Sequence, residues 1–213
     1  MVETFVTKAS MVYEYIKDAI LSGQFPPGKK INPKELSQQL NVSPVPVREA
    51  INKLSADGLI KLTPHVGACV AIIDKEAVEE LQMIRTELEC LVAKLATPQI
   101  SDEQLKKLDH ILKDSERVIL TGKYEKYPIL NRSFHFGIHD YSPYRILGKM
   151  IHEMYERLQL VPVLPWTKER AEKSLSDHRM IFKALSERNG ELTSKILKKH
   201  SSAPWHAIRK LKK

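Results

Sequence analysis

Apolar residues recur at helical spacing along the start of the chain, and turn-forming residues separate the segments. The first apolar stripe consists of Val12, Tyr15, Ile16, Ala19 and Ile20. This spacing predicts a helix that ends at Gly23, and the two consecutive prolines that follow predict a turn. A second, shorter helix is expected from Pro33, because proline suits the first turn of a helix and Leu36 and Leu40 share one face.

A third helix and a hairpin are expected next. Asn41 tolerates the left-handed conformation of a sharp turn between helices, and Ser43 can cap the helix after it. The apolar stripe of this helix consists of Val47, Ala50, Ile51 and Leu54. Residues 59–62 and 68–73 have the pattern of two strands around a tip at residues 63–67. This order is typical of a winged helix-turn-helix, although a small helical bundle with an incidental hairpin fits the same periodicity.

After Asp74 the pattern is helical throughout. One long stripe consists of Ala77, Leu81, Ile84, Leu88, Leu91 and Leu95. Ser101 and Gln104 can form a capping box for the next helix. Further helices are expected at about 124–140, 143–161, 168–188 and 190–203. The predicted fold is therefore mainly α, with an N-terminal winged helix-turn-helix in residues 1–74 followed by an all-α helical bundle in residues 75–213.

Composition narrows the class of protein. The chain is 42% hydrophobic and 28% charged, which is ordinary for a soluble globular protein. Its apolar runs are too short to span a bilayer, and no secretory signal opens it, so no membrane partner is expected. Cys69 and Cys90 do not form a paired motif, which argues against a disulfide scaffold. A cytoplasmic protein is expected.

The net charge of +8 does not by itself indicate nucleic-acid binding. Residues 1–74 contain eight Lys and Arg against seven Asp and Glu, and residues 75–192 contain nineteen of each. The surplus begins at Thr193, and a basic terminus is more often a solvated tail than a binding arm. DNA binding must therefore be argued from local motifs.

The segment from Leu36 to Leu54, LSQQLNVSPVPVREAINKL, resembles the GntR family of bacterial repressors. The similarity continues through residues 57–60 and 64–70, and upstream through residues 19–23 and 27–28. The helical remainder resembles the FCD effector domain of the FadR subfamily. The resemblance implies a transcription regulator rather than an enzyme, a repressor that binds double-stranded operator DNA as a homodimer. Its helical domain would serve dimerisation and bind a small organic acid as effector.

The resemblance also implies which residues contact DNA, and these are Lys34, Ser43, Pro44, Val45, Arg48, His65 and Gly67. Arg48 lies off the apolar stripe, where a guanidinium can bind guanine or phosphate. The family usually has Ser-Arg-Thr-Pro-Val-Arg where this chain has Ser-Pro-Val-Pro-Val-Arg, and Val66 replaces a common wing arginine. These departures predict lower affinity or an unusual operator, in which Val45 contacts a thymine methyl group.

For the helical domain the resemblance implies a divalent metal held by Asn131, His135, His178 and His200. Asn131 and His135 are four residues apart on one helical face. The family has aspartate at position 131, and a neutral amide binds metal more weakly than a carboxylate. Zinc or nickel suits such an imidazole-rich set. The remaining histidines, which are expected to be surface residues or polar fillers, are His110, His139, His152 and His206.

Arg85 matches an Arg-x-x-x-Glu segment of the first FCD helix, which implies that it binds the effector carboxylate. A surface ion pair with Glu89 is the alternative. Two other functions stay open from the residues alone. Three histidines with an open coordination position also describe a metal-dependent hydrolase. The arginine missing at Pro44 would fit a metabolite-binding module that has lost DNA binding.

Overall fold

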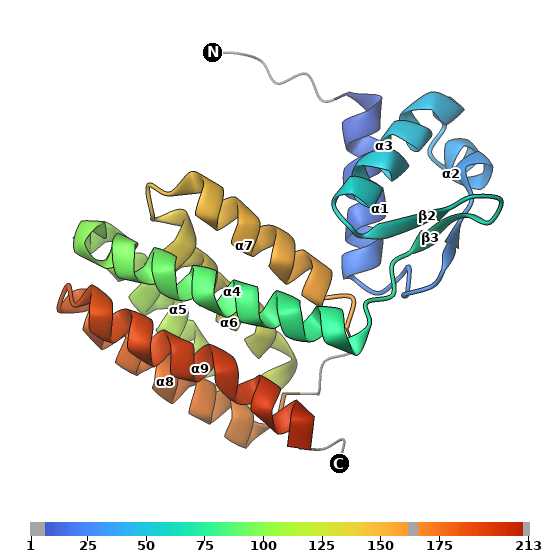
Figure 1. The fold of residues 1–213 in the computed structure, drawn as a ribbon. Coiled ribbons are helices and arrows are strands. Elements are labelled where there is room, and N and C mark those ends of the chain that lie inside the picture. Colours follow the sequence, from blue (N-terminus) through green and yellow to red (C-terminus); the bar gives the residue numbers. More distant parts are fainter. Residues whose placement is uncertain (1–6, 162–165, 211–213) are drawn as a thin grey trace. The chain divides into compact units, whose positions relative to one another are not determined.

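The computed structural model describes residues 7–161 and 166–210, with side chains described as far as residue 202. The chain divides into two compact units (Figure 1). The first holds Met1–Glu79 and Tyr155–Val163, and the second holds Glu80–Met154 and Leu164–Lys213. Among the described helices, none has both the length and the apolar content needed to cross a membrane.

The first unit contains three helices and a small sheet. The helices are α1 (Lys8–Leu21), α2 (Pro33–Gln39) and α3 (Pro44–Ala56). The strands are β1 (Lys30–Ile31), β2 (Ile60–Thr63) and β3 (Gly67–Val70), and they form an antiparallel sheet in the order β1–β3–β2. The predicted winged helix-turn-helix is confirmed. Strand β1 was not predicted, because two residues are too short to show an alternating pattern.

An apolar core fixes the orientation of α3 in this unit. Val47, Ala50, Ile51 and Leu54 are at most 3% exposed, and they pack with buried residues of α1, which confirms both predicted stripes. The turn between α2 and α3 contains Asn41 with φ of 50°, in the left-handed region as predicted. The opposite face of α3 is therefore held toward solvent.

The end of α7 (Arg145–Leu158) and the residues after it complete the first unit. Leu160 is 5% exposed and belongs to the same apolar core. Glu156 forms an ion pair of 2.6 Å with Lys17 of α1. The side chain of Arg157 covers Gly58, where an added Cβ would lie 2.8 Å from Nε. A segment distant in sequence is thus part of the structure that supports α3.

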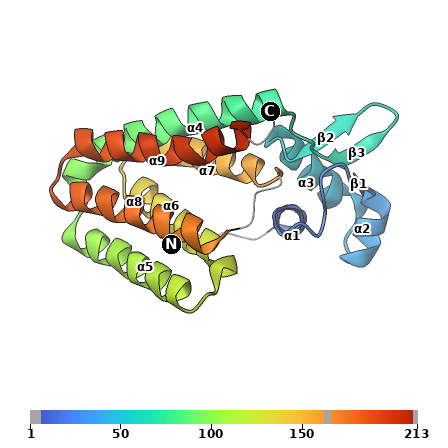
Figure 2. The ribbon, with the colours of Figure 1, turned by 90° about the horizontal axis from the view of Figure 1, so that it is seen from below.

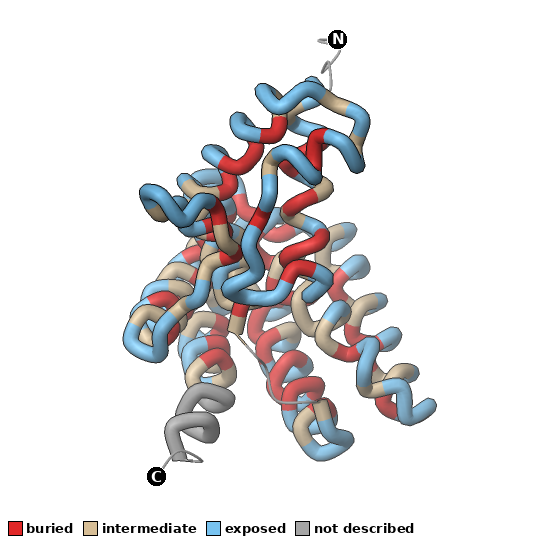
Figure 3. Tube along the Cα trace, turned by 90° about the vertical axis from the view of Figure 1, so that its right-hand side faces the viewer, coloured by how far each residue is buried: buried red, intermediate tan, exposed pale blue. Residues whose placement is uncertain are grey.

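The described remainder of the chain is helical, as predicted, and contains no strand. Its elements are α4 (Lys75–Ala96), η1 (Thr97–Gln99), α5 (Asp102–Leu120), η2 (Tyr124–Lys126), α6 (Tyr127–Asp140), α7, α8 (Lys168–Ser186) and α9 (Gly190–Lys210). Ser101 and Gln104 form the predicted capping box at the start of α5. Helices α8 and α9 lie side by side, and α5 packs against both α6 and α8 (Figures 1 and 2). Buried residues recur along the inner faces of the helices (Figure 3).

The predicted apolar stripe of α4 is wrong in part. Ile84 and Leu91 are 46% and 44% exposed, whereas the buried face includes Val92, Ala93 and the fully buried Glu89. The prediction counted only apolar residues, so it could not place a charged residue on the inner face. The buried face of α4 consequently lies at a different position around the helix axis from the predicted apolar stripe.

Candidate nucleic-acid interface and metal centre

The exposed face of α3 begins at Ser43, which occupies the N-cap position without a side-chain capping bond. Ser43, Pro44, Val45 and Arg48 are all exposed, and Val45 is 60% exposed although it is apolar. Pro44 and Pro46 have no N–H, so in this first turn the exposed Val45 supplies the backbone N–H without an intrahelical partner that can bind a phosphate. The face offers a guanidinium, a hydroxyl and an apolar side chain to a ligand.

The other predicted DNA contacts are Lys34 and two residues of the wing tip, which is the turn at residues 63–67 between β2 and β3. Lys34 lies exposed in the first turn of α2, where Asn32 caps the helix by accepting a hydrogen bond from the Lys34 N–H at 3.0 Å. His65 and Gly67 are exposed and have φ of 61° and 99°. No heavy atom lies within 4 Å of a Cβ added at Gly67, so glycine is favoured there by the backbone conformation and not by crowding.

Two lysines near the wing were missed in the sequence. Lys30 of β1 and Lys61 of β2 are both in register with Cys69 of β3, so the three side chains share one face of the sheet. Both lysines are exposed. Only the pairing of β1 with β3 reveals this basic face, and β1 was not predicted. It adds two candidate phosphate contacts beside the wing.

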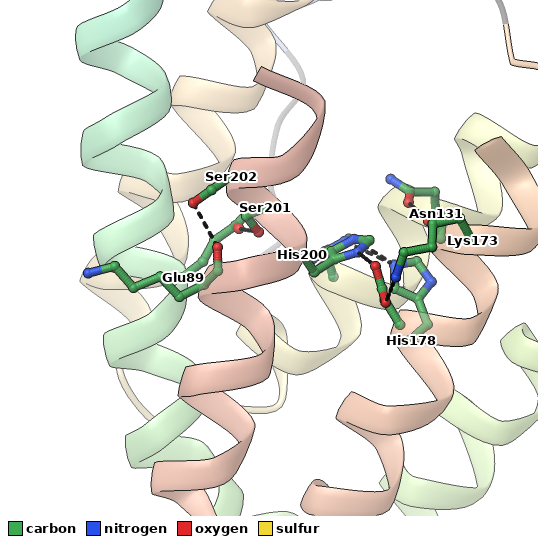
Figure 4. Close-up of polar contacts among 11 residues, drawn as sticks. Glu89, Asn131, Lys173, His178, His200, Ser201 and Ser202 are labelled. Atoms are coloured by element: carbon green, nitrogen blue, oxygen red, sulfur yellow. Dashed lines mark hydrogen bonds and ion pairs between the residues drawn. The ribbon is translucent and has the colours of Figure 1, made fainter. Parts of the chain in front are cut away.

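In the second unit, three of the predicted metal ligands converge. The candidate ligand atoms of His135, His178 and His200, from α6, α8 and α9, all lie within 4.8 Å of one another. The Nε2 atom of His178 is 3.2 Å from Nε2 of His135 and 3.1 Å from Nε2 of His200 (Figure 4). Residues separated by up to 65 positions in the sequence (135 to 200) are thus brought to one point.

This arrangement fits a bound cation better than a hydrogen-bond network. A single N–H on His178 Nε2 could donate to only one of the two Nε2 atoms that face it. Around a tetrahedral zinc ion with Zn–N distances of about 2.0–2.1 Å, ligand nitrogens lie roughly 3.3 Å apart. The observed separations are close to that value. The donor set therefore fits a divalent metal that prefers imidazole.

Burial keeps the imidazoles of His135 and His178 in the neutral form that binds metals. It lowers the pKa of His135 to about 3, and it lowers the pKa of His178 well below its usual value. His200 Nδ1 lies 3.3 Å from Asp177 Oδ2, and Lys173 forms an ion pair with the same carboxylate. The hydrogen bond from His200 is the main cause that lowers the pKa of Asp177. The motif-based prediction missed Asp177, although it directly precedes His178 in the sequence.

The fourth predicted ligand, Asn131, lies one turn before His135 on α6 (Figure 4). It is half-buried, and its Oδ1 accepts a hydrogen bond of 3.2 Å from Ser174 Oγ. The amide is therefore oriented by the hydroxyl of Ser174, and it contributes no charge to the site.

Arg85 lies on α4 and pairs with Glu89, with 3.6 Å between Nε and Oε1. The pair is inside the bundle and not on the surface, since the side chains are 13% and 0% exposed. Ser201 of α9 donates a hydrogen bond of 2.9 Å to Glu89 Oε2 (Figure 4). The charge of Glu89 raises the pKa of His135 against the larger effect of burial, and the charge of Arg85 lowers it. Both residues thus act electrostatically on the histidine cluster.

The other histidines differ from one another. His110 is exposed, and His152 lies 2.9 Å from Asp140. Of the two alternatives expected for His139, the surface residue is excluded and the polar filler is left, because His139 is 1% exposed. Neither of its ring nitrogens has a hydrogen-bond partner among the described residues. Burial lowers the pKa of His139 to about 4. His206 lies in the stretch of α9 whose side chains are outside the described part.

Two family models match the chain. The model of bacterial regulatory proteins of the gntR family matches residues 8–70, and the FCD domain matches residues 79–203. The two matches correspond closely to the winged helix-turn-helix and to the helical part described above.

Similar proteins match over nearly the whole chain. The HTH-type transcriptional regulator YdhC of Bacillus subtilis is 31% identical over 190 residues, which cover 88% of this chain and 85% of the relative. The HTH-type transcriptional repressor RspR of Escherichia coli is 26% identical, with coverage of 94% and 89%. Among solved structures, McbR/YncC of E. coli has the same fold, with a TM-score of 0.80, 23% identity and coverage of 98% and 100%.

Proposed function

This chain belongs to the GntR family of bacterial regulatory proteins and carries an FCD domain, and from that premise we propose that it is a metal-dependent, effector-controlled repressor. As a member of this family it is a DNA-binding transcriptional regulator. In the proposal, residues 1–74 bind operator DNA, and residues 75–213 bind the effector and form the dimer. The effector is a small carboxylate metabolite bound beside a metal, and it changes the affinity for the operator.

The convergence of the three Nε2 atoms carries the proposed metal site. His135, His178 and His200 hold zinc or nickel, and Asn131 adds a neutral oxygen ligand. The bound metal supplies open coordination positions that a carboxylate can occupy. Arg85 pairs with the other end of the effector, and its position inside the bundle supports this role.

For the operator we propose that the N-terminal end of α3 enters the major groove and that the wing tip reaches the minor groove. Arg48 binds guanine or phosphate, and Val45 contacts a thymine methyl group. Lys34, Ser43, Pro44, His65 and Gly67 line the same interface. The exposure of all seven side chains or backbones supports the proposal. With proline at position 44, the preferred sequence differs from that of relatives with arginine there.

We propose a homodimer, which would place its two recognition helices in successive major grooves of a short palindromic operator. Helix α4 supports this with the exposed apolar side chains of Met83, Ile84 and Leu91, which are 66%, 46% and 44% exposed. Apolar side chains gathered on one helix commonly mark an interaction surface. A second copy of the chain would cover them.

The two rival functions are less well supported. Against a hydrolase, Asp177, the carboxylate beside the histidines, already accepts from His200 and pairs with Lys173, and the similar curated proteins are transcriptional regulators. Against a module without DNA binding, the recognition helix keeps Arg48 and a free N-terminal end.

The proposal is tested by fluorescence anisotropy with DNA from upstream of the chain's own coding region. We expect specific binding that a small mono- or dicarboxylate weakens in the presence of zinc or nickel, but not after chelation. Arg85→Ala should remove the response to the carboxylate and leave the affinity of the effector-free protein unchanged. Linkage requires that DNA weakens carboxylate binding by the same factor, which calorimetry measures. Equal carboxylate affinities with and without DNA would contradict the proposed control.

A further inference from the structure

We infer that Asp177 is a positioning residue of the metal centre, which orients His200 and supplies the negative charge that Asn131 lacks. The inference rests on the proposed metal site and deepens it. Asp177 is not among the residues that the family resemblance implied as ligands. It belongs to α8, directly before the ligand His178, and its side chain is 12% exposed.

The geometry fixes the role of each nitrogen of His200. Nδ1 lies 3.3 Å from Asp177 Oδ2, and Nε2 lies 3.1 Å from His178 Nε2. When Nδ1–H donates to the carboxylate, Nε2 carries the lone pair and faces the point shared by the three rings. A carboxylate behind a metal-binding histidine fixes its tautomer and increases its basicity. His200 thus has the arrangement of a metal ligand with a carboxylate behind it.

The other two ligands are held differently. The Nδ1 atoms of His135 and His178 are buried and have no hydrogen-bond partner among the described residues. Phe134 stacks on the ring of His178, with 4.4 Å between centroids and 23° between planes. Packing therefore orients these two rings, whereas a carboxylate orients His200, the most exposed of the three at 10%. Of the three, His200 depends most on a polar partner.

Charge gives the second part of the argument. Three neutral imidazoles and the amide of Asn131 contribute no negative charge to a divalent cation. The carboxylate of Asp177 hydrogen-bonds with His200 Nδ1, so it places a negative charge one ring away from the proposed cation. Its other oxygen pairs with Lys173, whose side chain is 68% exposed. The ammonium group offsets part of the charge that the cation would otherwise experience.

The test is a metal-affinity measurement on the full chain, with zinc in competition with a chromogenic chelator. Asp177→Asn should weaken zinc binding by about 10- to 100-fold, the usual effect of losing such a partner. Asp177→Glu should restore most of the affinity, because it keeps the charge and the acceptor. Glu172→Gln is the matched control, since Glu172 pairs with Lys168 on the same helix at the same spacing. It should leave the affinity unchanged.

Two further variants separate charge from structure. In an Asn131→Asp background, Asp177→Asn should cost several-fold less, because the site already holds a carboxylate. Lys173→Met should strengthen zinc binding, and it changes an exposed side chain, so it tests the charge even if Asp177→Asn fails to fold. Circular dichroism reports the fold of each variant.

The outcomes distinguish the inference from the function on which it rests. If the parent protein binds neither zinc nor nickel, the metal centre itself is wrong, and the role of Asp177 with it. If the parent binds zinc and folded Asp177→Asn binds it equally well, only the role of Asp177 is overturned. If Asp177→Asn lowers the zinc affinity equally with and without Asn131→Asp, and Lys173→Met does not raise it, the proposed compensation of charge is overturned.

Discussion

The core of the first unit consists mainly of apolar side chains, such as Ile16 and Leu54, whereas the second unit buries His135, His178 and Glu89 among its apolar residues. An apolar core is stabilised by burial and close packing alone. Buried polar groups lower stability unless a partner compensates them. The core of the first unit is therefore suited to keeping the exposed face of α3 in a fixed position, and that of the second unit to binding a ligand.

The largest expected effect tests the apolar core. Leu54→Ala removes a fully buried side chain of α3, so the free energy of unfolding of the first unit should fall by about 2–5 kcal/mol. Operator binding should fall with it, while zinc binding by the second unit should remain. Urea unfolding followed by circular dichroism measures the loss. Leu62→Ala, at a side chain 46% exposed, is the control and should change stability by less than about 0.5 kcal/mol.

The stability of the second unit, which buries polar groups, should depend instead on a bound ligand. Zinc at about 100 times its Kd should raise the free energy of unfolding of the second unit by about 2.7 kcal/mol and leave the first unit unchanged. Calorimetric unfolding with and without zinc measures this. His200→Gln should abolish the shift, and His110→Gln, at an exposed histidine, should keep it. Equal stabilisation of both units by zinc would contradict the proposed difference between the two cores.

The same contrast explains what the sequence could predict. The stripe of Val47, Ile51 and Leu54 was read correctly because apolar periodicity reports an apolar core directly. On α4 the rule failed, because Glu89 is buried through Arg85 and Ser201, partners that periodicity does not encode.

Long-range contacts were also beyond the sequence pattern. Leu160 enters the core of the first unit from a distant segment, and β1 is visible only through its pairing with β3. The proposed metal ligands were predicted from the resemblance to a family, whereas the role proposed for Asp177 required the position of His200. The sequence thus predicted the helices and motifs, and the structure added the contacts between residues that are distant in the sequence.

A smaller effect is expected at the surface that the first unit presents. Arg48→Ala should weaken operator binding by about 1–3 kcal/mol without changing the fold, because Arg48 is exposed and lies off the apolar stripe. Anisotropy titrations at fixed salt measure the change. Lys8→Ala, which removes one exposed positive charge from α1, should cost less. If Arg48→Ala binds operator as tightly as the parent, α3 is not the recognition helix.

The last prediction concerns His139, a buried histidine of the second unit that is not among the proposed metal ligands. Burial lowers its pKa to about 4 in the folded protein, whereas an unfolded histidine titrates near 6.5. The unfolded state therefore binds more protons between these values, so stability falls as pH falls from about 6.5 toward 4. The slope from one such histidine is at most about 1.4 kcal/mol per pH unit. His139→Leu should remove this contribution, and urea unfolding at several pH values compares the slopes. At neutral pH the variant should be no less stable, because both ring nitrogens lack a hydrogen-bond partner among the described residues. A less stable variant at neutral pH would show instead that water or a bound molecule completes the hydrogen bonds of His139.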